Sequence, residues 1–485
     1  MSIRTGQQYL DQIDAQHREL WVRGEKITTN ASEHPAFHNI THTMAHLYDM
    51  QHDPALQEDM TYQSPGTGDT VGLSYLQPKT KADLIRKRTM MKHWADYAGG
   101  MLGRSPDYLN SSVIALASAA DYFGENDPRF GDNVQRYYEY IRDNDLCTTH
   151  TLINPQSNRA ASASESTNAP IAAHVVEQHP SKGVLVRGAR MLATLPVADE
   201  LLVFPSTVIK NRPEDQAYAF AFAVPCDIAG LKFLCRESFD YGMGHYDHPL
   251  GSRFEEMDAV VVFDDVWVPW DRVFLLGRGD LCNGMYNETG AVNHMSYQVL
   301  VKNIAKAEFV LGVMAKIADT INIGQFQHVQ EKIAETAMTV EMLKAFQRAS
   351  EEDATVNRWG LMTPDFAPLN AMRNIFPRIY PTLIHYLQRI GAGGLMAIPS
   401  EEDLANPALA PDILRYYQAA QADADTRNRL YRLAWDIAVS SFGQRQVLYE
   451  QFFFGDPVRM ASAYYQSYPV DVLKERVDAL LYRND

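Results

Sequence analysis

The sequence predicts a mainly α-helical protein with a central β domain, and three observations support this. Residues 1 to about 145 show the polar–apolar periodicity of helices. From Cys147 to about residue 275 the apolar period shortens to two, which is typical of strands. Beyond Pro269 no proline occurs before Pro364, and apolar residues recur every three or four positions, as in a helical bundle. We therefore expect a helical domain at 1–145, a β domain at 146–280 and a helical bundle at 281–485.

The composition is typical of a soluble globular chain, with 485 residues, 46% hydrophobic and 21% charged. A formal net charge of −16 argues against nucleic acid or an anionic membrane as a partner, because either would attract a basic surface. The first residues lack the apolar core of a signal peptide, and no apolar stretch approaches the ~20 residues that would span a bilayer. Four scattered cysteines form no CxxC pair. We expect a cytoplasmic protein.

In the first domain, a helix is predicted from Thr80 to Tyr97, because Thr80 and Asp83 have the spacing of a capping box. Gly99, Gly100 and Gly103 then end the helix. His38, His42 and His46 recur every four residues, which could place three metal ligands on one helix face, but no further ligand motif accompanies them and we assign no metal site.

A second helix is predicted to begin directly after these glycines. Ser105 suits the N-cap, Pro106 the first helical position and Asp107 the positive end of the helix dipole. Arg104 and Tyr108 are four residues apart across this start and can point in the same direction. From spacing alone, an ordinary helix-loop-helix corner with an exposed arginine is the favoured interpretation.

Alternating residues predict the strands of the β domain. The pattern is present at 184–186, at 201–204 and from Gln216 to Val224, where large side chains alternate with alanines. Residues 252–270 have a strand-turn-strand pattern that ends at Pro269. The segment 158–170 is rich in Ala and Ser and reads as a loop, with a moving lid as the alternative to a plain surface loop.

A polar cluster opens this domain, running from Thr148 to Thr151 and from Asn154 to Arg159. Its hydroxyls, amides, imidazole and guanidinium could bind the pyrimidine edge of a flavin, although a polar strand edge would look the same. Hydroxyls also occur at strand ends, at Thr194 and at Ser206 and Thr207, where turn capping is the alternative role.

The last domain is predicted to be helical. Apolar residues from Leu300 to Ala318 step by three and four, and further helical runs extend over 365–390 and 426–453. Long apolar seams of this kind often pack against a second subunit, so we expect an oligomer.

Several segments together resemble the oxygenase component family of 4-hydroxyphenylacetate 3-monooxygenase. They are GRSPDY (103–108), CTTHTLINPQSNR (147–159), VRGARMLAT (186–194), FPST (204–207), the run 248–270 and FFFGDPVRM (452–460). The resemblance covers nearly the whole chain in the family's order. It implies an acyl-CoA dehydrogenase-like fold, a homotetramer, and the use of diffusible FADH2 (reduced FAD) supplied by a separate flavin reductase.

The resemblance also implies roles for individual residues. Arg104, Tyr108 and His150 resemble the groups that hold the phenol oxygen, within a substrate-binding segment that also includes Ser105, Pro106 and Asp107. Ser206 and Thr207 resemble the groups that take the substrate's carboxylate. The residues that resemble flavin contacts are His150, Thr151, Leu152, Gln156, Ser157, Asn158, Arg159, Thr194, Gly455, Asp456, Pro457 and Val458. For the last four, the resemblance implies a contact in a neighbouring subunit's site.

These residue types suit ortho-hydroxylation of a phenol to a catechol with O2 and reduced FAD. Donors and positive charge at the phenol oxygen favour the phenolate, and each unit of lowered pKa is worth about 1.4 kcal/mol. His150 is the candidate base, with an ordinary pKa near the working pH. No GxGxxG motif follows a predicted strand, so the chain shows no nicotinamide site for reducing its own flavin.

Three alternatives stay open at this point. An acyl-CoA dehydrogenase would use the same fold. A 4-hydroxybutyryl-CoA dehydratase would need an iron–sulfur cluster, for which His294 is available, but 99–108 contains no cysteine and Val301 stands where another would be expected. A non-enzymatic helical scaffold would make the polar cluster incidental. The phenol substrate itself is not fixed by the sequence.

Overall fold

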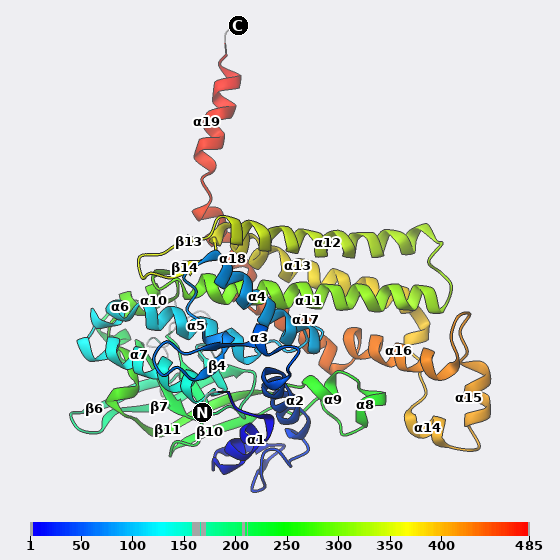
Figure 1. The fold of residues 1–485 in the computed structure, drawn as a ribbon, viewed down its shortest axis with the longest axis horizontal. Coiled ribbons are helices and arrows are strands. Elements are labelled where there is room, and N and C mark those ends of the chain that lie inside the picture. The colour runs from blue at the N-terminus through cyan, green and yellow to red at the C-terminus, as the bar shows by residue number, and fades with distance from the viewer. Residues whose placement is uncertain (1–2, 158–164, 166–170, 206–208, 211, 484–485) are drawn as a thin grey trace.

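The computed structural model describes residues 3–157, 165, 171–205, 209–210 and 212–483. Figure 1 shows a layer of long C-terminal helices above a β region, with the N-terminal helices beside and between them. The mainly helical fold class with a central β domain is therefore confirmed.

The N-terminal segment is helical, with four short strands. Its helices are α1 (Gly6–Ala15), α2 (His38–Asp49), α3 (Gln57–Met60), α4 (Lys81–Tyr97), α5 (Pro106–Ser118), α6 (Ala120–Gly124) and α7 (Pro128–Asp143), with 3-10 turns at Met50–His52 and Leu73–Tyr75. Its strands are β1 (Glu19–Val22), β2 (Glu25–Lys26), β3 (Thr61–Gln63) and β4 (Thr70–Gly72). The purely helical expectation for residues 1–145 is wrong at these strands. β1 lies parallel to β10 (Leu231–Cys235), so a distant sheet edge determines its conformation.

Two sheets form the β region. One has the order β2-β1-β10-β11-β7-β6 and the other β12-β9-β8-β5. Their remaining strands are β5 (Thr148–Thr151), β6 (His174–His179), β7 (Gly183–Ala193), β8 (Glu200–Val203), β9 (Phe220–Pro225), β11 (Asp258–Val268) and β12 (Val273–Leu276). β13 (Thr355–Val356) and β14 (Met362–Thr363) form a separate two-stranded sheet in the C-terminal segment, and β3 and β4 form another in the N-terminal segment. β5 runs parallel to β8, and β8 runs antiparallel to β9.

Two strand predictions need correction. Residues 252–270 do not form strand-turn-strand: the short helix α9 (Gly251–Phe254) precedes one long strand, β11. Asp264 and Asp265 lie in a bulge of β11, where the pairing with β7 shifts between Phe263 and Val266. In the run 216–224 only the part from Phe220 is a strand, because Pro213–Tyr218 forms a 3-10 helix.

The C-terminal segment forms the helical bundle. It contains α10 (Gly279–Glu288), α11 (Ala291–Thr320), α12 (Gln327–Glu352), α13 (Phe366–Gly391), α14 (Glu401–Ala405), α15 (Ala410–Tyr416), α16 (Ala424–Ala438) and α17 (Ser441–Phe452). A 3-10 turn at Ala392–Leu395 follows α13. The short helix α8 (Gly244–Asp247) and a 3-10 turn at Trp270–Arg272 precede the bundle in the chain. The predicted helix over 426–453 is interrupted between α16 and α17, where Ser440 accepts a hydrogen bond from the Gly443 amide and caps α17.

The chain ends in an arm made of α18 (Pro457–Ser467) and α19 (Val470–Leu481). Neither helix has a buried residue, and α19 projects away from the body in Figure 1. No helix of the described chain is both long enough and apolar enough to cross a membrane.

Candidate active site

The corner between α4 and α5 packs so closely that only glycine fits. Gly99 and Gly100 have positive φ angles of 56° and 68°. A Cβ on Gly100 would lie 2.6 Å from the backbone N of Lys306 in α11, and a Cβ on Gly103 would lie 2.4 Å from the Tyr449 ring in α17. The glycines therefore let the corner reach the bundle, and they deliver Arg104 to the junction of all three segments.

The predicted helix start after this corner is confirmed in position. Ser105 is the N-cap of α5 and Pro106 occupies its first turn, while α4 begins with the predicted capping box of Thr80 and Asp83. The Ser105 hydroxyl makes no capping hydrogen bond and instead donates to the Asp107 carboxylate over 2.5 Å. Gln298 in α11 donates to the same carboxylate over 3.0 Å, which fixes Asp107 against the bundle.

Arg104, Tyr108 and His150 lie together. The Arg104 guanidinium carbon is 5.4 Å from the centre of the Tyr108 ring, and the Tyr108 and His150 rings are 5.9 Å apart. Tyr108 and His150 are 6% and 3% exposed. The guanidinium donates to the Ala193 carbonyl over 2.7 Å at the end of β7. The structure thus brings two residues of the corner to the first strand of the polar cluster.

The aromatic side chains around this trio form a shared wall. Phe453 meets the Tyr108 ring edge-on at 5.5 Å, and Phe204 lies 5.6 Å from the His150 ring. The Arg104 guanidinium also lies 5.3 Å from the Phe453 ring. We call Arg104, Tyr108, His150, Phe204 and Phe453 the phenol wall. Apolar rings around one cation and one imidazole exclude water and strengthen the local electrostatics.

Burial controls the protonation of this wall. It lowers the pKa of His150 well below its ordinary value, and the nearby Arg104 charge lowers it further. The fold therefore moves the pKa of His150 away from the ordinary imidazole value that made it the candidate base, and the imidazole is neutral at pH 7. Burial raises the pKa of Tyr108, against the influence of Arg104 and Arg373, so this phenol keeps its proton. Arg104 keeps its charge, because Tyr449, Tyr108 and Glu256 outweigh the effect of its burial on the pKa.

The residues predicted to hold the flavin follow β5 and end β7. Thr151 donates to the Met191 carbonyl over 2.5 Å, and Thr149 donates to the Thr194 carbonyl over 2.7 Å. Thr194 is buried and has a φ of 93°, a strained value for a β-branched residue. Leu152 is partly buried, whereas Gln156 and Ser157 are exposed. Four further predicted residues lie outside the described chain: Asn158, Arg159, Ser206 and Thr207. The predicted loop or lid at 158–170 also falls almost wholly outside it.

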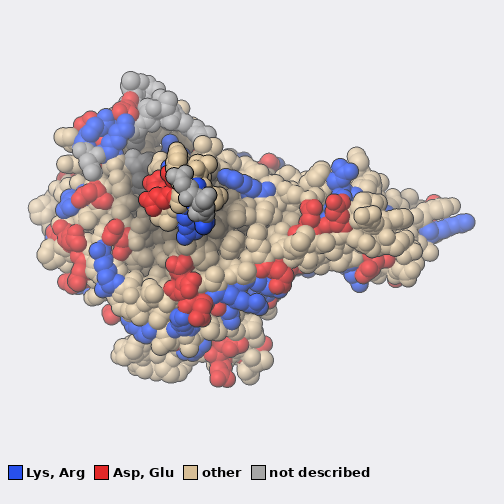
Figure 2. Space-filling model, turned by 90° about the horizontal axis from the view of Figure 1, so that it is seen from above, with Lys and Arg blue, Asp and Glu red and all other residues tan. Residues whose placement is uncertain are grey.

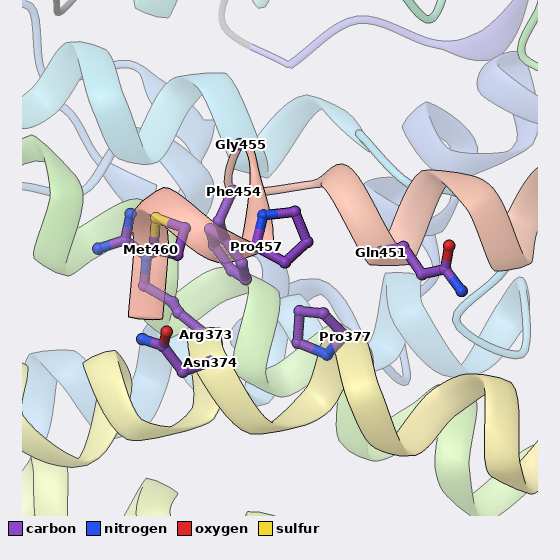
Figure 3. A pocket seen from close by; sticks show the side chains of 8 residues that line it. All are labelled: Arg373, Asn374, Pro377, Gln451, Phe454, Gly455, Pro457 and Met460. Atoms are coloured by element: carbon purple, nitrogen blue, oxygen red, sulfur yellow. The ribbon is translucent and has the colours of Figure 1, made fainter. Parts of the chain in front are cut away.

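The predicted turn Gly455–Val458 begins two residues after Phe453 in the chain. Asp456 accepts hydrogen bonds from the amides of Val458 and Arg459 and so begins α18. Val458 is 77% exposed. Figure 3 shows Gly455 and Pro457 beside a small pocket that is also lined by Arg373, Asn374 and Pro377 of α13, by Gln451 and Phe454, and by Met460.

Four residues that the sequence reasoning did not single out lie at the site. Arg373 is close enough to Tyr108 to lower its pKa, and its buried Nε lacks a hydrogen-bond partner among the described residues. Tyr286 lies 5.6 Å from Phe204, ring to ring, with its hydroxyl also unpartnered within the described chain. Arg190 is fully buried in β7 and donates to the Leu152 carbonyl over 2.6 Å. Glu256 accepts hydrogen bonds from the corner itself. Arg373, Tyr286 and Glu256 come from segments distant in sequence from the corner, so no local spacing could reveal them, whereas Arg190 lies four residues before the predicted Thr194.

Two histidine groups outside the wall have ordinary packing partners. The His38 and His42 rings lie 4.2 Å apart, and His46 packs on Tyr97 at 4.4 Å. His294 is buried near Lys87, and burial lowers its pKa to about 3. Within the described residues there is no group of three or more His, Cys, Asp or Glu side chains that could hold a metal ion.

Comparisons with known proteins agree with this architecture. The family model described as 4-hydroxyphenylacetate 3-hydroxylase N terminal matches residues 5–275, and the C-terminal model of the same family matches residues 282–482. The chain belongs to the 4-hydroxyphenylacetate 3-hydroxylase family. Within this family, it is 47% identical to the oxygenase component of 4-hydroxyphenylacetate 3-monooxygenase from Geobacillus sp., over 99% of this chain and 97% of the relative.

Solved structures extend the comparison to three dimensions. A crystal structure of the oxygenase component of 4-hydroxyphenylacetate 3-monooxygenase, complexed with FAD and 4-hydroxyphenylacetate, is 48% identical to this hydroxylase-family chain. It covers 99% of this chain and 98% of its own, with a TM-score of 0.94. An archaeal 4-hydroxybutyryl-CoA dehydratase from N. maritimus has a TM-score of 0.89 over 100% of this chain and 96% of its own. Its identity of 20% shows a shared fold alone.

Proposed function

We propose that this chain is the oxygenase component of a two-component, FADH2-dependent monooxygenase that hydroxylates 4-hydroxyphenylacetate, or a closely related phenol, ortho to its hydroxyl group. One observation supports this most directly: Arg104, Tyr108 and His150 converge within 6 Å centre to centre in a buried aromatic wall. A guanidinium, a phenol and an imidazole are donors and acceptors suited to an aromatic hydroxyl. The related oxygenase solved with FAD and 4-hydroxyphenylacetate supports the choice of substrate.

The three residues would activate the substrate through its oxygen. Arg104 places a charge that burial leaves unscreened, which stabilises a phenolate. Tyr108, which keeps its proton, donates a hydrogen bond to that oxygen. His150 is neutral at pH 7 and therefore able to accept the phenolic proton when the substrate binds. A phenolate pushes electron density into the ortho position, where the new C–O bond forms.

The flavin side of the site has the polar groups that FAD requires. Reduced FAD, when bound, would supply the activated oxygen. The hydroxyl of Thr148 and the side-chain oxygen of Asn154 are buried without hydrogen-bond partners among the described residues, so the polar cluster of β5 and the following segment contains unsatisfied polar atoms. His150, Thr151, Leu152, Gln156, Ser157, Asn158, Arg159 and Thr194 would hold the cofactor from this side, and Gly455, Asp456, Pro457 and Val458 from the other. Ser206 and Thr207 would take the substrate's carboxylate.

We further propose a homotetramer served by a separate flavin reductase in the cytoplasm. The C-terminal arm supports assembly, because Leu473, Val477 and Leu480 are 42%, 56% and 73% exposed on one helix and no other described residue covers them. The relative's description as an oxygenase component supports a reductase. Acidic and basic side chains lie interspersed on the face shown in Figure 2.

A direct assay tests the proposal. The purified chain is mixed with chemically reduced FAD, O2 and a panel of phenols, and catechol products are identified by mass spectrometry. We expect 4-hydroxyphenylacetate to give the highest yield. Product from a phenol without a carboxylate tail at equal efficiency would overturn the substrate assignment. Product from none of the phenols would overturn the function.

A further inference from the structure

Glu256 holds the corner that carries Arg104. Its two carboxylate oxygens accept hydrogen bonds from the Gly103 amide over 2.9 Å and the Arg104 amide over 3.0 Å. Glu256 is 3% exposed, so water does not compete for these bonds. Two consecutive amide donors are therefore matched by two acceptor oxygens of one side chain, which fixes both the position and the direction of the Arg104 backbone.

The main chain of the same residue holds the opposite side of the site. The Leu195 amide donates to the Glu256 carbonyl over 2.8 Å and also approaches the Met257 carbonyl at 3.2 Å. This bond closes the turn in which Thr194 and Leu195 have φ angles of 93° and 57°. Such a turn costs about 1–3 kcal/mol per strained residue and persists only where its surroundings hold it.

A third contact connects the side chain of Arg104 to the strand that precedes this turn. The Arg104 guanidinium donates to the Ala193 carbonyl over 2.7 Å, directly before Thr194. The Glu256 carboxylate therefore holds the backbone of Arg104. The side chain of Arg104 is held by the end of β7, and the Glu256 carbonyl fixes the turn that follows this strand. The neighbouring contacts do not duplicate this role: Gln446 donates only to the Met101 carbonyl, and Arg445 pairs more closely with Asp258, at 2.5 Å, than with Glu256, at 3.5 Å.

We propose that Glu256 is a positioning residue that sets the placement of the phenol-binding guanidinium of Arg104 relative to the flavin-side turn at Thr194. This inference rests on the proposed function. Glutamine cannot substitute, because its amide group has one acceptor oxygen for two N–H donors and its own NH2 would face the second. Aspartate keeps the charge, but it is one methylene shorter and cannot reach both amides from the same backbone.

The preceding residue provides a matched control. Glu255 is also a buried carboxylate, 2% exposed, but it pairs with Arg236 at 2.6 Å and makes no hydrogen bond to the corner among the described residues. Glu255→Gln therefore removes a buried charge of the same kind, one residue away, without touching the Arg104 amide.

The test measures phenol ionisation rather than turnover. The full-length protein is loaded with reduced FAD in the absence of oxygen and titrated with 4-nitrophenol, whose phenolate is yellow, at several pH values. For the wild type we expect a bound-phenol pKa below that of the free phenol. For Glu256→Gln we expect about tenfold weaker binding and a bound-phenol pKa shifted about one unit back toward the free value. Glu255→Gln should bind and titrate like the wild type.

The outcomes separate the two proposals. Wild-type binding and titration in Glu256→Gln, or equal shifts in both variants, would overturn the positioning role. A wild-type protein that leaves the phenol's pKa unchanged would instead count against the proposed function. If Glu256→Gln does not fold, as judged by circular dichroism, Glu256→Asp replaces it: the same loss is expected despite the retained charge, and wild-type behaviour would overturn the proposal.

Discussion

The phenol wall and the C-terminal arm differ in how completely one chain stabilises them. Every residue of the wall contacts side chains from other segments of the same chain, and His150 is 3% exposed. The arm has no buried residue, and Leu480 is 73% exposed. The comparison teaches that one chain is enough to enclose Arg104, Tyr108 and His150, whereas the segment from Gly455 to Val458, which begins the arm, has few covering partners among the described residues.

Removing the arm's apolar stripe should have the largest effect. Leu473→Ser, Val477→Ser and Leu480→Ser together should lower the oligomeric state, as measured by size-exclusion chromatography with light scattering. Each buried side chain of this kind contributes about 1.5–3 kcal/mol, so the three contribute about 4 kcal/mol or more to assembly. A control triple change to glutamine at Lys474, Glu475 and Asp478, on the charged face, should leave the mass unchanged. An unaltered mass in the serine variant would mean that the arm is not an interface.

Arg104→Ala should break the wall without affecting assembly. Loss of a preorganised charge at the phenol oxygen is expected to lower kcat/KM for hydroxylation about 100- to 1,000-fold. Arg187→Ala is the control, because Arg187 is a surface residue that pairs with Asp265. The measurement is catechol formation with excess reduced FAD, together with the oligomer mass. If Arg104→Ala hydroxylates the phenol normally, Arg104 does not activate the substrate and the proposed mechanism is wrong.

The contrast between wall and arm also decides what the sequence could reveal. The helix start at Ser105 and Pro106 was predictable because caps depend on neighbours within one turn. The proximity of Arg104 and Tyr108 followed from their four-residue spacing. The proximity of His150 rested on a family resemblance, because no local pattern connects it to the corner.

The missed features depend on contacts between distant segments. Glu256 meets the Arg104 amide across 152 residues of chain, so nothing near either residue indicates the bond. β1 is short and directly follows α1, and its pairing with the distant strand β10 makes it a strand. The sequence pattern predicts a turn within residues 252–270, but β7 pairs on both sides of the bulge at Asp264 and Asp265 and makes β11 a single strand.

Tyr108→Phe sharpens the assignment within the wall. The phenolic proton stays on Tyr108 because burial raises its pKa, so in the proposed mechanism the hydroxyl would donate to the substrate oxygen. Removing a hydrogen bond to a charged group costs about 1.5–3 kcal/mol, which predicts roughly a thirtyfold loss of kcat/KM. Tyr286→Phe is the paired variant, because the buried Tyr286 hydroxyl near Phe204 has no hydrogen-bond partner among the described residues. If Tyr286→Phe loses more kcat/KM than Tyr108→Phe, then Tyr286 and not Tyr108 is the hydrogen-bond donor to the substrate oxygen.

The smallest expected effect is a pH dependence of stability that belongs to the chain's own core. Burial lowers the pKa of His294 to about 3, whereas the unfolded imidazole titrates near its ordinary pKa of about 6.5. The unfolded state therefore binds the proton first as the pH falls. Stability is fully present above pH 6.5 and decreases by about 1.4 kcal/mol per pH unit below it, until the folded group also titrates near pH 3.

His294→Gln should reduce this acid sensitivity. Urea unfolding at pH 7.5 and pH 5.5 should show a pH-dependent loss of unfolding free energy that is about 1.4 kcal/mol smaller in the variant than in the wild type. His42→Gln, on the exposed face of α2, is the control and should keep the wild-type difference. If His294→Gln also keeps the full difference, His294 is protonated in the folded state. The buried core around His294 would then tolerate a positive charge on the imidazole that its burial should exclude.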